Sequence, residues 1–126
     1  MRGQVSFEFF VAFSFLILFF LASVMIYDHE NRSSQAFLSR MRAQAVASDF
    51  SRAINGVYQC GSGCSYVIQL RQDYSLKIYG KVVEVAGNLQ VGQAPLVTDR
   101  IELHSATPGA YIRIVNNNGV VELHDA

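Results

Sequence analysis

Residues 9–27 form an apolar run that only Ser14 and Ser23 interrupt, and this run constrains the fold more than any other feature of the chain. At about 19 residues, it is long enough to cross the hydrocarbon core of a bilayer as a helix. Arg2 precedes the run, and acidic residues follow it directly. The positive-inside rule therefore predicts a single-pass segment with a cytoplasmic N-terminus and an exported C-terminal part.

Glu8 places one carboxylate at the start of this apolar run. A charged side chain in the middle of a bilayer costs about 2.5–3.5 kcal/mol, and less near the interface. The sequence therefore predicts a partner for Glu8 that offsets this cost. Two alternatives stay open: a plain signal anchor whose acid reaches the lipid headgroups, and a cleaved secretory signal peptide. The apolar region of a signal peptide usually spans about 7–15 residues, which is shorter than this run.

The residues around Glu8 carry a specific resemblance. Gly3 is followed by Gln4-Val5-Ser6-Phe7-Glu8, which resembles the Q-x-S-x-E pattern of archaeal class III signal peptides. Such peptides mark type IV pilin-like proteins, adhesion pilins among them. The resemblance covers about the first 27 residues and implies that a prepilin peptidase cuts between Gly3 and Gln4, on the cytoplasmic side. The leader is then residues 1–3, and the apolar helix stays on the mature protein.

The resemblance also implies how the mature chain assembles. Type IV pilin-like subunits form helical filaments at the cell surface, with the help of pilus assembly machinery in the membrane. Glu8 lies four residues after the new N-terminus, so it is expected to meet the free ammonium at Gln4 of a neighbouring copy. Such a pair in a low-dielectric core fixes the axial register, while apolar faces supply most of the cohesion. Cyclisation of Gln4 would remove that ammonium.

The helix is expected to continue beyond the membrane. No Gly or Pro interrupts residues 4–54, and an apolar stripe at helical spacing predicts a core-packing face: Phe37, Leu38, Met41, Ala45, Val46, Phe50, Ile54 and Val57. Asn55-Gly56 is expected to end the helix. A break near residues 28–34 is the alternative, because Asn31, Ser33 and Ser34 are capable helix caps. The domain prediction is a leader at 1–3, a helix at 4–58 and an exported head at 59–126.

Two cysteines follow the helix, in the segment Cys60-Gly61-Ser62-Gly63-Cys64. On an exported segment this spacing favours a local disulfide between Cys60 and Cys64. Free thiols and a metal or redox site are the alternatives. A metal site needs further ligands, which the spacing of the three histidines does not supply.

Beyond the cysteines, apolar and polar residues alternate with the period of two that is typical of strands. Turn residues divide this part into expected strands at 66–71, 76–79, 81–85, 89–91, 96–98, 100–104, 111–115 and 120–124. The first two are expected to form a hairpin across Gln72-Asp73, and the last two a hairpin across the NNNG segment at 116–119. The sequence thus predicts an α+β fold, in which a long N-terminal helix, transmembrane in its first half, packs on a small antiparallel sheet.

The segments IELH at 101–104 and VELH at 121–124 repeat one pattern. This repeat predicts neighbouring strands that face the same way, and a two-histidine metal site is the alternative. We expect no metal and no cofactor.

Other function classes find little support in the sequence. The net charge is zero and the basic residues are scattered, so a nucleic-acid surface is not expected. No nucleophile motif, phosphate loop or carboxylate pair indicates an enzyme. The sequon at Asn31 is a possible glycosylation site. We therefore expect a subunit of an archaeal type IV pilus-like filament. The alternatives are a membrane-anchored binding domain that does not polymerise and a minor pseudopilin-like component.

Overall fold

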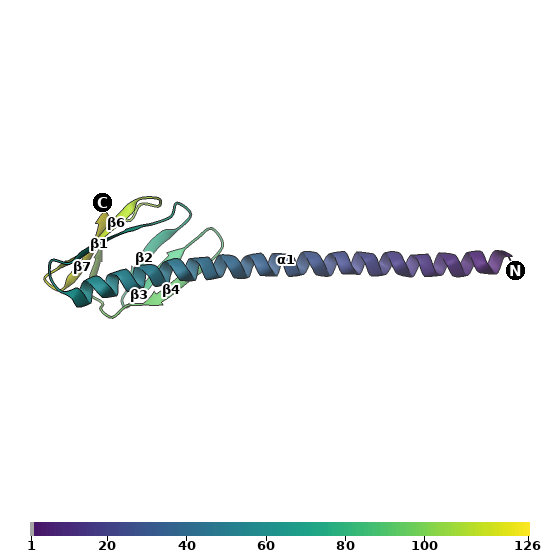
Figure 1. Ribbon diagram of the computed structural model, residues 1–126, viewed down its shortest axis with the longest axis horizontal. Helices are drawn as coiled ribbons and strands as arrows, with labels where there is room; N and C mark the ends of the chain where they lie inside the picture. The colour runs from purple at the N-terminus through teal and green to yellow at the C-terminus, as the bar shows by residue number, and fades with distance from the viewer. Residues whose placement is uncertain (1) are drawn as a thin grey trace. The chain divides into compact units, whose positions relative to one another are not determined.

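The computed structural model of the protein describes residues 2–126, and its fold is α+β, as the sequence predicts (Figure 1). A helix, α1 (Arg2–Cys60), is followed by seven strands: β1 (Ser65–Gln69), β2 (Ser75–Tyr79), β3 (Val82–Ala86), β4 (Val91–Pro95), β5 (Ile101–Leu103), β6 (Tyr111–Asn117) and β7 (Val120–Asp125). The chain divides into two compact units, Met1–Ala36 and Phe37–Ala126, so α1 contributes to both.

Helix α1 continues through residues 28–34, so the expected alternative of a break there is wrong. The predicted end at Asn55-Gly56 is also wrong, because α1 extends to Cys60. Gly61 adopts the left-handed conformation, with φ of 100°, that commonly follows the last helical residue. Gly56 therefore lies inside the helix, where a glycine is tolerated at a modest cost.

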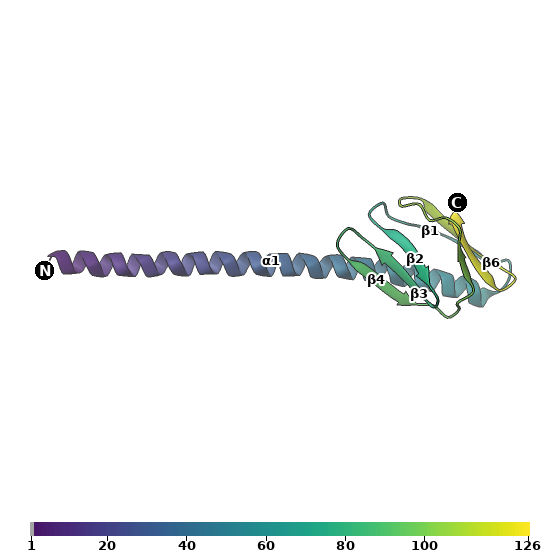
Figure 2. The same ribbon diagram turned by 180° about the vertical axis from the view of Figure 1, so that it is seen from behind.

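The strands form two sheets, one in the order β1-β6-β7-β5 and one in the order β2-β3-β4. All neighbours pair antiparallel except β5 and β7, which are parallel. Strands β2 and β5 contact each other, so β1 and β4 are the outermost strands of the series (Figure 2). The parallel β5–β7 pair aligns Ile101 with Val121 and Leu103 with Leu123, which confirms that the repeated IELH and VELH segments are neighbours.

Strands β6 and β7 form the hairpin that the NNNG segment predicts. Asn118 and Gly119 have φ of 52° and 88°, as the two central residues of a tight hairpin turn require. The expected hairpin between β1 and β2 is wrong: β1 pairs with β6, and β2 pairs with β3. A turn does exist there, since Tyr74 N donates to Arg71 O at 3.1 Å, but it sends the two strands into different sheets.

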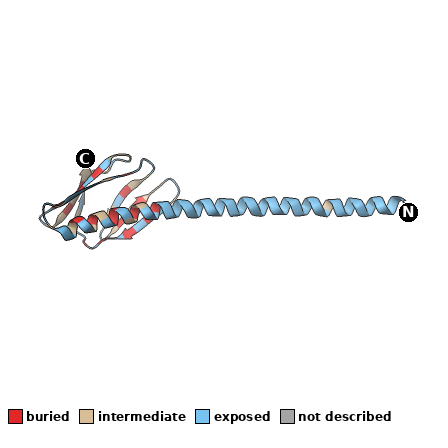
Figure 3. Ribbon diagram, viewed as in Figure 1, coloured by how far each residue is buried: buried red, intermediate tan, exposed pale blue. Residues whose placement is uncertain are grey.

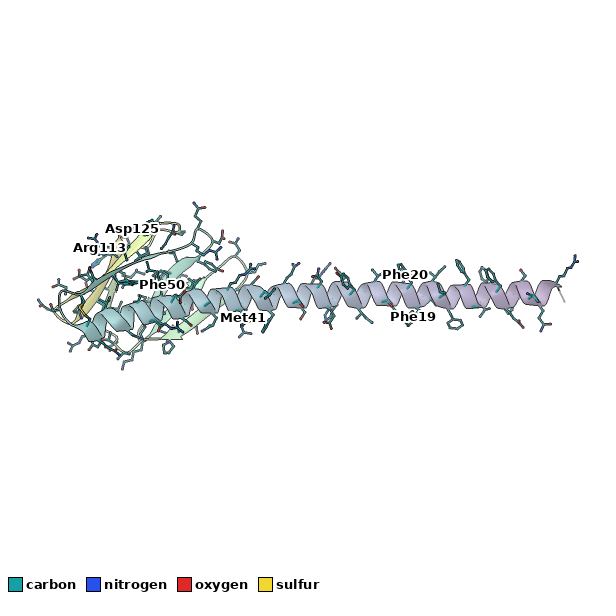
Figure 4. The ribbon with its side chains drawn as sticks, viewed as in Figure 1. Phe19, Phe20, Met41, Phe50, Arg113 and Asp125 are labelled. Atoms are coloured by element: carbon teal, nitrogen blue, oxygen red, sulfur yellow. A yellow bond between two sulfur atoms is a disulfide. The ribbon has the colours of Figure 1, made fainter. Side chains whose placement is uncertain are left out.

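The core lies between the last turns of α1 and the inner faces of both sheets. Phe50 and Ile54 are fully buried there, as are Leu70, Val83, Val85, Ile112, Ile114, Val121 and Leu123. The predicted stripe is right for Phe50, Ile54 and Val57, but Leu38, Met41 and Ala45 are exposed. Ala43 and Ala47 are buried instead, and the backbone of Ala43 lies against Gly92 of β4. Figure 4 shows Met41 and Phe50 on opposite sides of α1.

Three polar side chains of α1 bind the outer edge of β4 and the chain just after it. The Gln44 side chain donates from Nε2 to Gln93 O at 2.6 Å and accepts at Oε1 from Gln93 N at 3.2 Å. Ser51 Oγ donates to Pro95 O, and Asn55 Oδ1 accepts from Val97 N at 2.9 Å. These residues recur at intervals of seven and four, so they form one polar stripe that satisfies backbone groups at this sheet edge.

Cys60 and Cys64 form a disulfide in the structure, with 6.1 Å between their Cα atoms. The bond links the last residue of α1 to the residue before β1. Gly61 and Gly63 both have positive φ, which lets the short loop close. The disulfide therefore ties the helix end to the first strand.

Candidate functional site

The N-terminal part of α1 exposes apolar side chains around its whole circumference. From Val5 to Tyr27 every large apolar residue is at least one-third exposed, and Phe19 reaches 77%. Figure 3 shows that the buried residues gather in the head and in the adjoining turns of α1. In Figure 4, Phe19 and Phe20 project to different sides of the helix. A helix that is apolar all round requires lipid or protein around it.

The two serines of the apolar run place no free hydroxyl donor on this surface. Ser14 Oγ donates to Phe10 O at 2.8 Å, and Ser23 Oγ donates to Phe19 O at 2.9 Å. Both bonds stay within the helix, where a hydroxyl can satisfy itself against the carbonyl one turn back. The segment is long and apolar enough to cross a membrane. This finding agrees with the predicted membrane segment by length and composition.

Gln4 and Glu8 lie one helical turn apart on an exposed face at the start of α1. Gly3, the other residue of the predicted cleavage site, is also exposed and helical, with open space where a Cβ would stand. Among residues 2–126 the ion pairs are Asp28–Arg32 and Glu102–His104, so Glu8 has no cationic partner in the described chain.

The segment after the apolar run is polar and exposed. Arg32 binds Asp28 at 3.0 Å, one turn apart along the helix. Asn31, the predicted glycosylation site, is exposed and helical. Its side chain is therefore accessible, and glycosylation stays a prediction.

An open groove of about 590 Å³ lies beside the β1 edge of the head. Its lining combines apolar surface with one cation and one carboxylate: Asp49, Arg52, Ala53, Gly56, Val57 and Cys60 from α1, and Cys64, Ser65, Tyr66 and Ile68 from the chain that follows. The two outer strands thus differ, because polar side chains of α1 bind the β4 edge while the groove runs along β1. No sequence signal pointed to this groove, since the groove depends on which strand pairs with β6.

A polar cluster at the opposite edge of the larger sheet combines Glu102, His104 and Glu122. The repeated IELH and VELH segments were the only sequence signal for it. The structure brings together the two glutamates and the first histidine, and leaves His124 outside the cluster.

Asp125 at the C-terminal end of β7 is held by the β5–β6 loop. Thr107 Oγ1 donates to Asp125 Oδ2 at 2.6 Å, and Thr107 N donates to Oδ1 at 2.9 Å. These bonds favour the charged carboxylate and hold the pKa of Asp125 below its usual value of 3.8. The arrangement closes the loop onto the end of the hairpin and offers no reacting group.

Comparisons of the chain with protein-family models, curated proteins and solved structures found no match. The function is therefore argued from two features of the helix: its exposed apolar surface and the carboxylate at its start.

Proposed function

We propose that the protein is a structural subunit of an archaeal type IV pilus-like surface filament. A prepilin peptidase cuts between Gly3 and Gln4, the apolar helix first holds the subunit in the membrane, and the assembly machinery then moves it into a helical bundle of copies. The head is exported and faces outward on the filament. The observation that supports this proposal is the single carboxylate of Glu8 at the start of a helix that is apolar on every side.

Lipid covers the apolar surface but leaves the carboxylate without a counter-charge. A bundle of identical helices covers the same surface and also supplies one, because cleavage creates an ammonium at Gln4 of each copy. Gln4 and Glu8 are four residues apart, which corresponds to about 6 Å along a helix. A neighbour displaced by one such step brings its N-terminus beside Glu8, so the ion pair sets the spacing between successive subunits.

The helix surface beyond the membrane segment supports the same assembly. Phe37, Leu38 and Met41 are all more than half exposed. They lie on α1 before its buried turns, where neighbouring copies in a bundle would cover them. Burial of these side chains removes apolar surface from water, which favours assembly.

One structural feature favours a second function. The open groove beside β1 is suited to a ligand, as expected of a membrane-anchored binding domain that does not polymerise. Abundance separates the candidates: a major subunit is the main protein of sheared filaments, a minor pseudopilin-like component is a trace protein there, and a monomeric binding domain is absent from them.

Substitution of Glu8 in the native cell tests the proposal. Glu8→Gln and Glu8→Ala are expected to insert into the membrane in normal amounts and to give few or no filaments, because the counter-charge for the N-terminus is lost. Ser14→Ala is the matched control, since it changes a polar residue of the same segment whose hydroxyl bonds only within the helix. Normal filament yield from both Glu8 variants would contradict the proposal.

A further inference from the structure

The cluster at the β5 edge originates in the repeated IELH and VELH segments. Parallel pairing of β5 and β7 aligns Glu102 with Glu122, one strand apart. His104 directly follows β5, and its backbone N donates to Leu123 O of β7 at 2.9 Å, so the extended pairing continues to this residue. Because side chains alternate along an extended chain, residues 102 and 104 share a sheet face with residue 122 of β7. Val121 and Leu123 are fully buried, so this shared face is the outer one.

The ligand atoms of the cluster are close together. One side-chain oxygen or nitrogen from each of Glu102, His104 and Glu122 lies within 4.8 Å of the other two. His104 Nε2 and Glu102 Oε2 are 3.6 Å apart. Asn117 Nδ2 donates to Glu122 Oε1 at 3.2 Å, which orients this carboxylate and leaves its other oxygen available.

The charges of the cluster favour a cation. Two carboxylates directly opposite each other on neighbouring strands repel. In the part of the chain that the structure describes, neither glutamate forms an ion pair with a lysine or arginine; the only ion-pairing group is His104. The imidazole of His104 adds a ring nitrogen, which in its neutral form is a common ligand for metal ions.

We propose that Glu102, His104 and Glu122 bind a divalent transition-metal ion, with Zn²⁺ the best fit. Zinc takes imidazole nitrogen and carboxylate oxygen at about 2.0–2.2 Å in tetrahedral geometry, which puts ligand atoms about 3.3–3.6 Å apart. The distance of 3.6 Å between His104 Nε2 and Glu102 Oε2 matches this spacing, and water would take the fourth position that the three residues leave open. A mixed imidazole and carboxylate set prefers zinc over Ca²⁺ and Mg²⁺, which take oxygen ligands.

The bound ion links two strands that otherwise share a short ladder. Strand β5 has three residues, and its partner in the larger sheet is β7. A metal with ligands on both strands fixes this edge, so Zn²⁺ stabilises the folded head by binding the native state and not the unfolded one. This proposal is independent of filament assembly.

Zinc titration of the full-length chain tests the site. The protein is prepared without a histidine tag, solubilised in detergent and titrated with ZnCl₂ by calorimetry, with CaCl₂ and MgCl₂ in parallel. We expect one saturable Zn²⁺ site and a thermal midpoint that rises with Zn²⁺ concentration. His104→Ala and Glu122→Gln are expected to weaken Zn²⁺ affinity about tenfold or more. Loss of a residue that only orients a metal ligand already weakens metal affinity by about this factor, so loss of a ligand should weaken it at least as much.

His124→Ala and His29→Ala are the matched controls. His124 lies on β7 outside the cluster, and His29 lies in α1, so both are expected to keep wild-type affinity. Circular dichroism checks that each variant folds. The proposal is overturned if the wild type binds no Zn²⁺ saturably or if His104→Ala and Glu122→Gln bind it normally. An equal loss of affinity in His124→Ala or His29→Ala would overturn the three-residue assignment.

Discussion

Gly92 of β4 packs directly against the backbone of Ala43 in α1. A Cβ at residue 92 would overlap the carbonyl group of Ala43, which belongs to a helix and is not free to move aside. Ala43 is itself fully buried. The pair of small residues therefore sets how closely the helix and the smaller sheet approach each other.

Gly92→Ala is expected to destabilise the head by about 1–3 kcal/mol, because the added methyl group forces helix and strand apart. Thermal unfolding of the full-length chain in detergent measures the change. Gly56→Ala is the matched control, because Gly56 is helical with open space at the Cβ position. This substitution is expected to raise the free energy of unfolding by about 0.5–1 kcal/mol. Equal effects from both substitutions would contradict the close approach at Gly92.

Gln44→Ala is expected to destabilise the head by about 1 kcal/mol, because two hydrogen bonds to an exposed strand edge are lost. Hydrogen exchange gives the sharper readout, since the Gln93 amide loses the acceptor that protects it. Gln35→Ala, an exposed glutamine of the same helix, is the control and is expected to leave this amide unchanged. Slow exchange at Gln93 in Gln44→Ala would refute the role of Gln44 at this edge.

The helix illustrates what the sequence could and could not predict. Its length followed from the absence of Pro and Gly over residues 4–54, and its core positions Phe50 and Ile54 followed from helical spacing. The prediction of which helix face is buried before Phe50 was wrong, because periodicity selects residues by their apolarity alone. The close approach to Gly92 places Ala43 at the interface instead, and Ala47 is buried as well.

The strands show the same limit. Turn chemistry predicted the β6–β7 hairpin, because Asn118-Gly119 suits only a few backbone conformations. The Gln72-Asp73 segment was a genuine turn, but a turn fixes chain reversal and not strand pairing. The partner of β1 lies more than 40 residues further along the chain, beyond local signals. For the same reason, the β1 groove was not predicted as a site. The repeat of IELH and VELH did predict the neighbouring strands, but its alternative reading was a two-histidine site, whereas the cluster joins His104 to Glu102 and Glu122.

The disulfide between Cys60 and Cys64 is expected to contribute about 2 kcal/mol, because it closes only a short loop. The double variant Cys60→Ser/Cys64→Ser should therefore unfold at a lower temperature than the wild type. A reductant should lower the wild-type midpoint to that of the double variant and leave the variant unaffected. A wild-type midpoint that reductant does not change, although thiol titration shows reduced cysteines, would contradict this role.

Asp125 is expected to make part of the head's stability depend on pH. Its pKa is lowered in the folded state by the bonds from Thr107, so its contribution is fully present above the ordinary value of 3.8 and is lost as pH falls through the lower folded pKa. Asp125→Asn should unfold at a lower temperature than the wild type at pH 7. This difference in unfolding temperature should narrow below about pH 3.8. Asp73→Asn, in an exposed turn, is the control. If the difference in unfolding temperature between Asp125→Asn and the wild type stays constant down to pH 2, the role of the Asp125 carboxylate is contradicted.

The mature N-terminus of the chain in sheared surface filaments tests the central proposal most directly. Filaments are sheared from native cells, and the intact mass of their main protein is measured. We predict that this protein is the present chain without Met1-Arg2-Gly3, beginning at Gln4, with a free terminal amine available to Glu8. Cyclisation of Gln4 would appear in the same spectrum as the loss of one ammonia. Recovery of the chain only from membranes, with its first three residues retained, would contradict both the processing and the assembly that we propose.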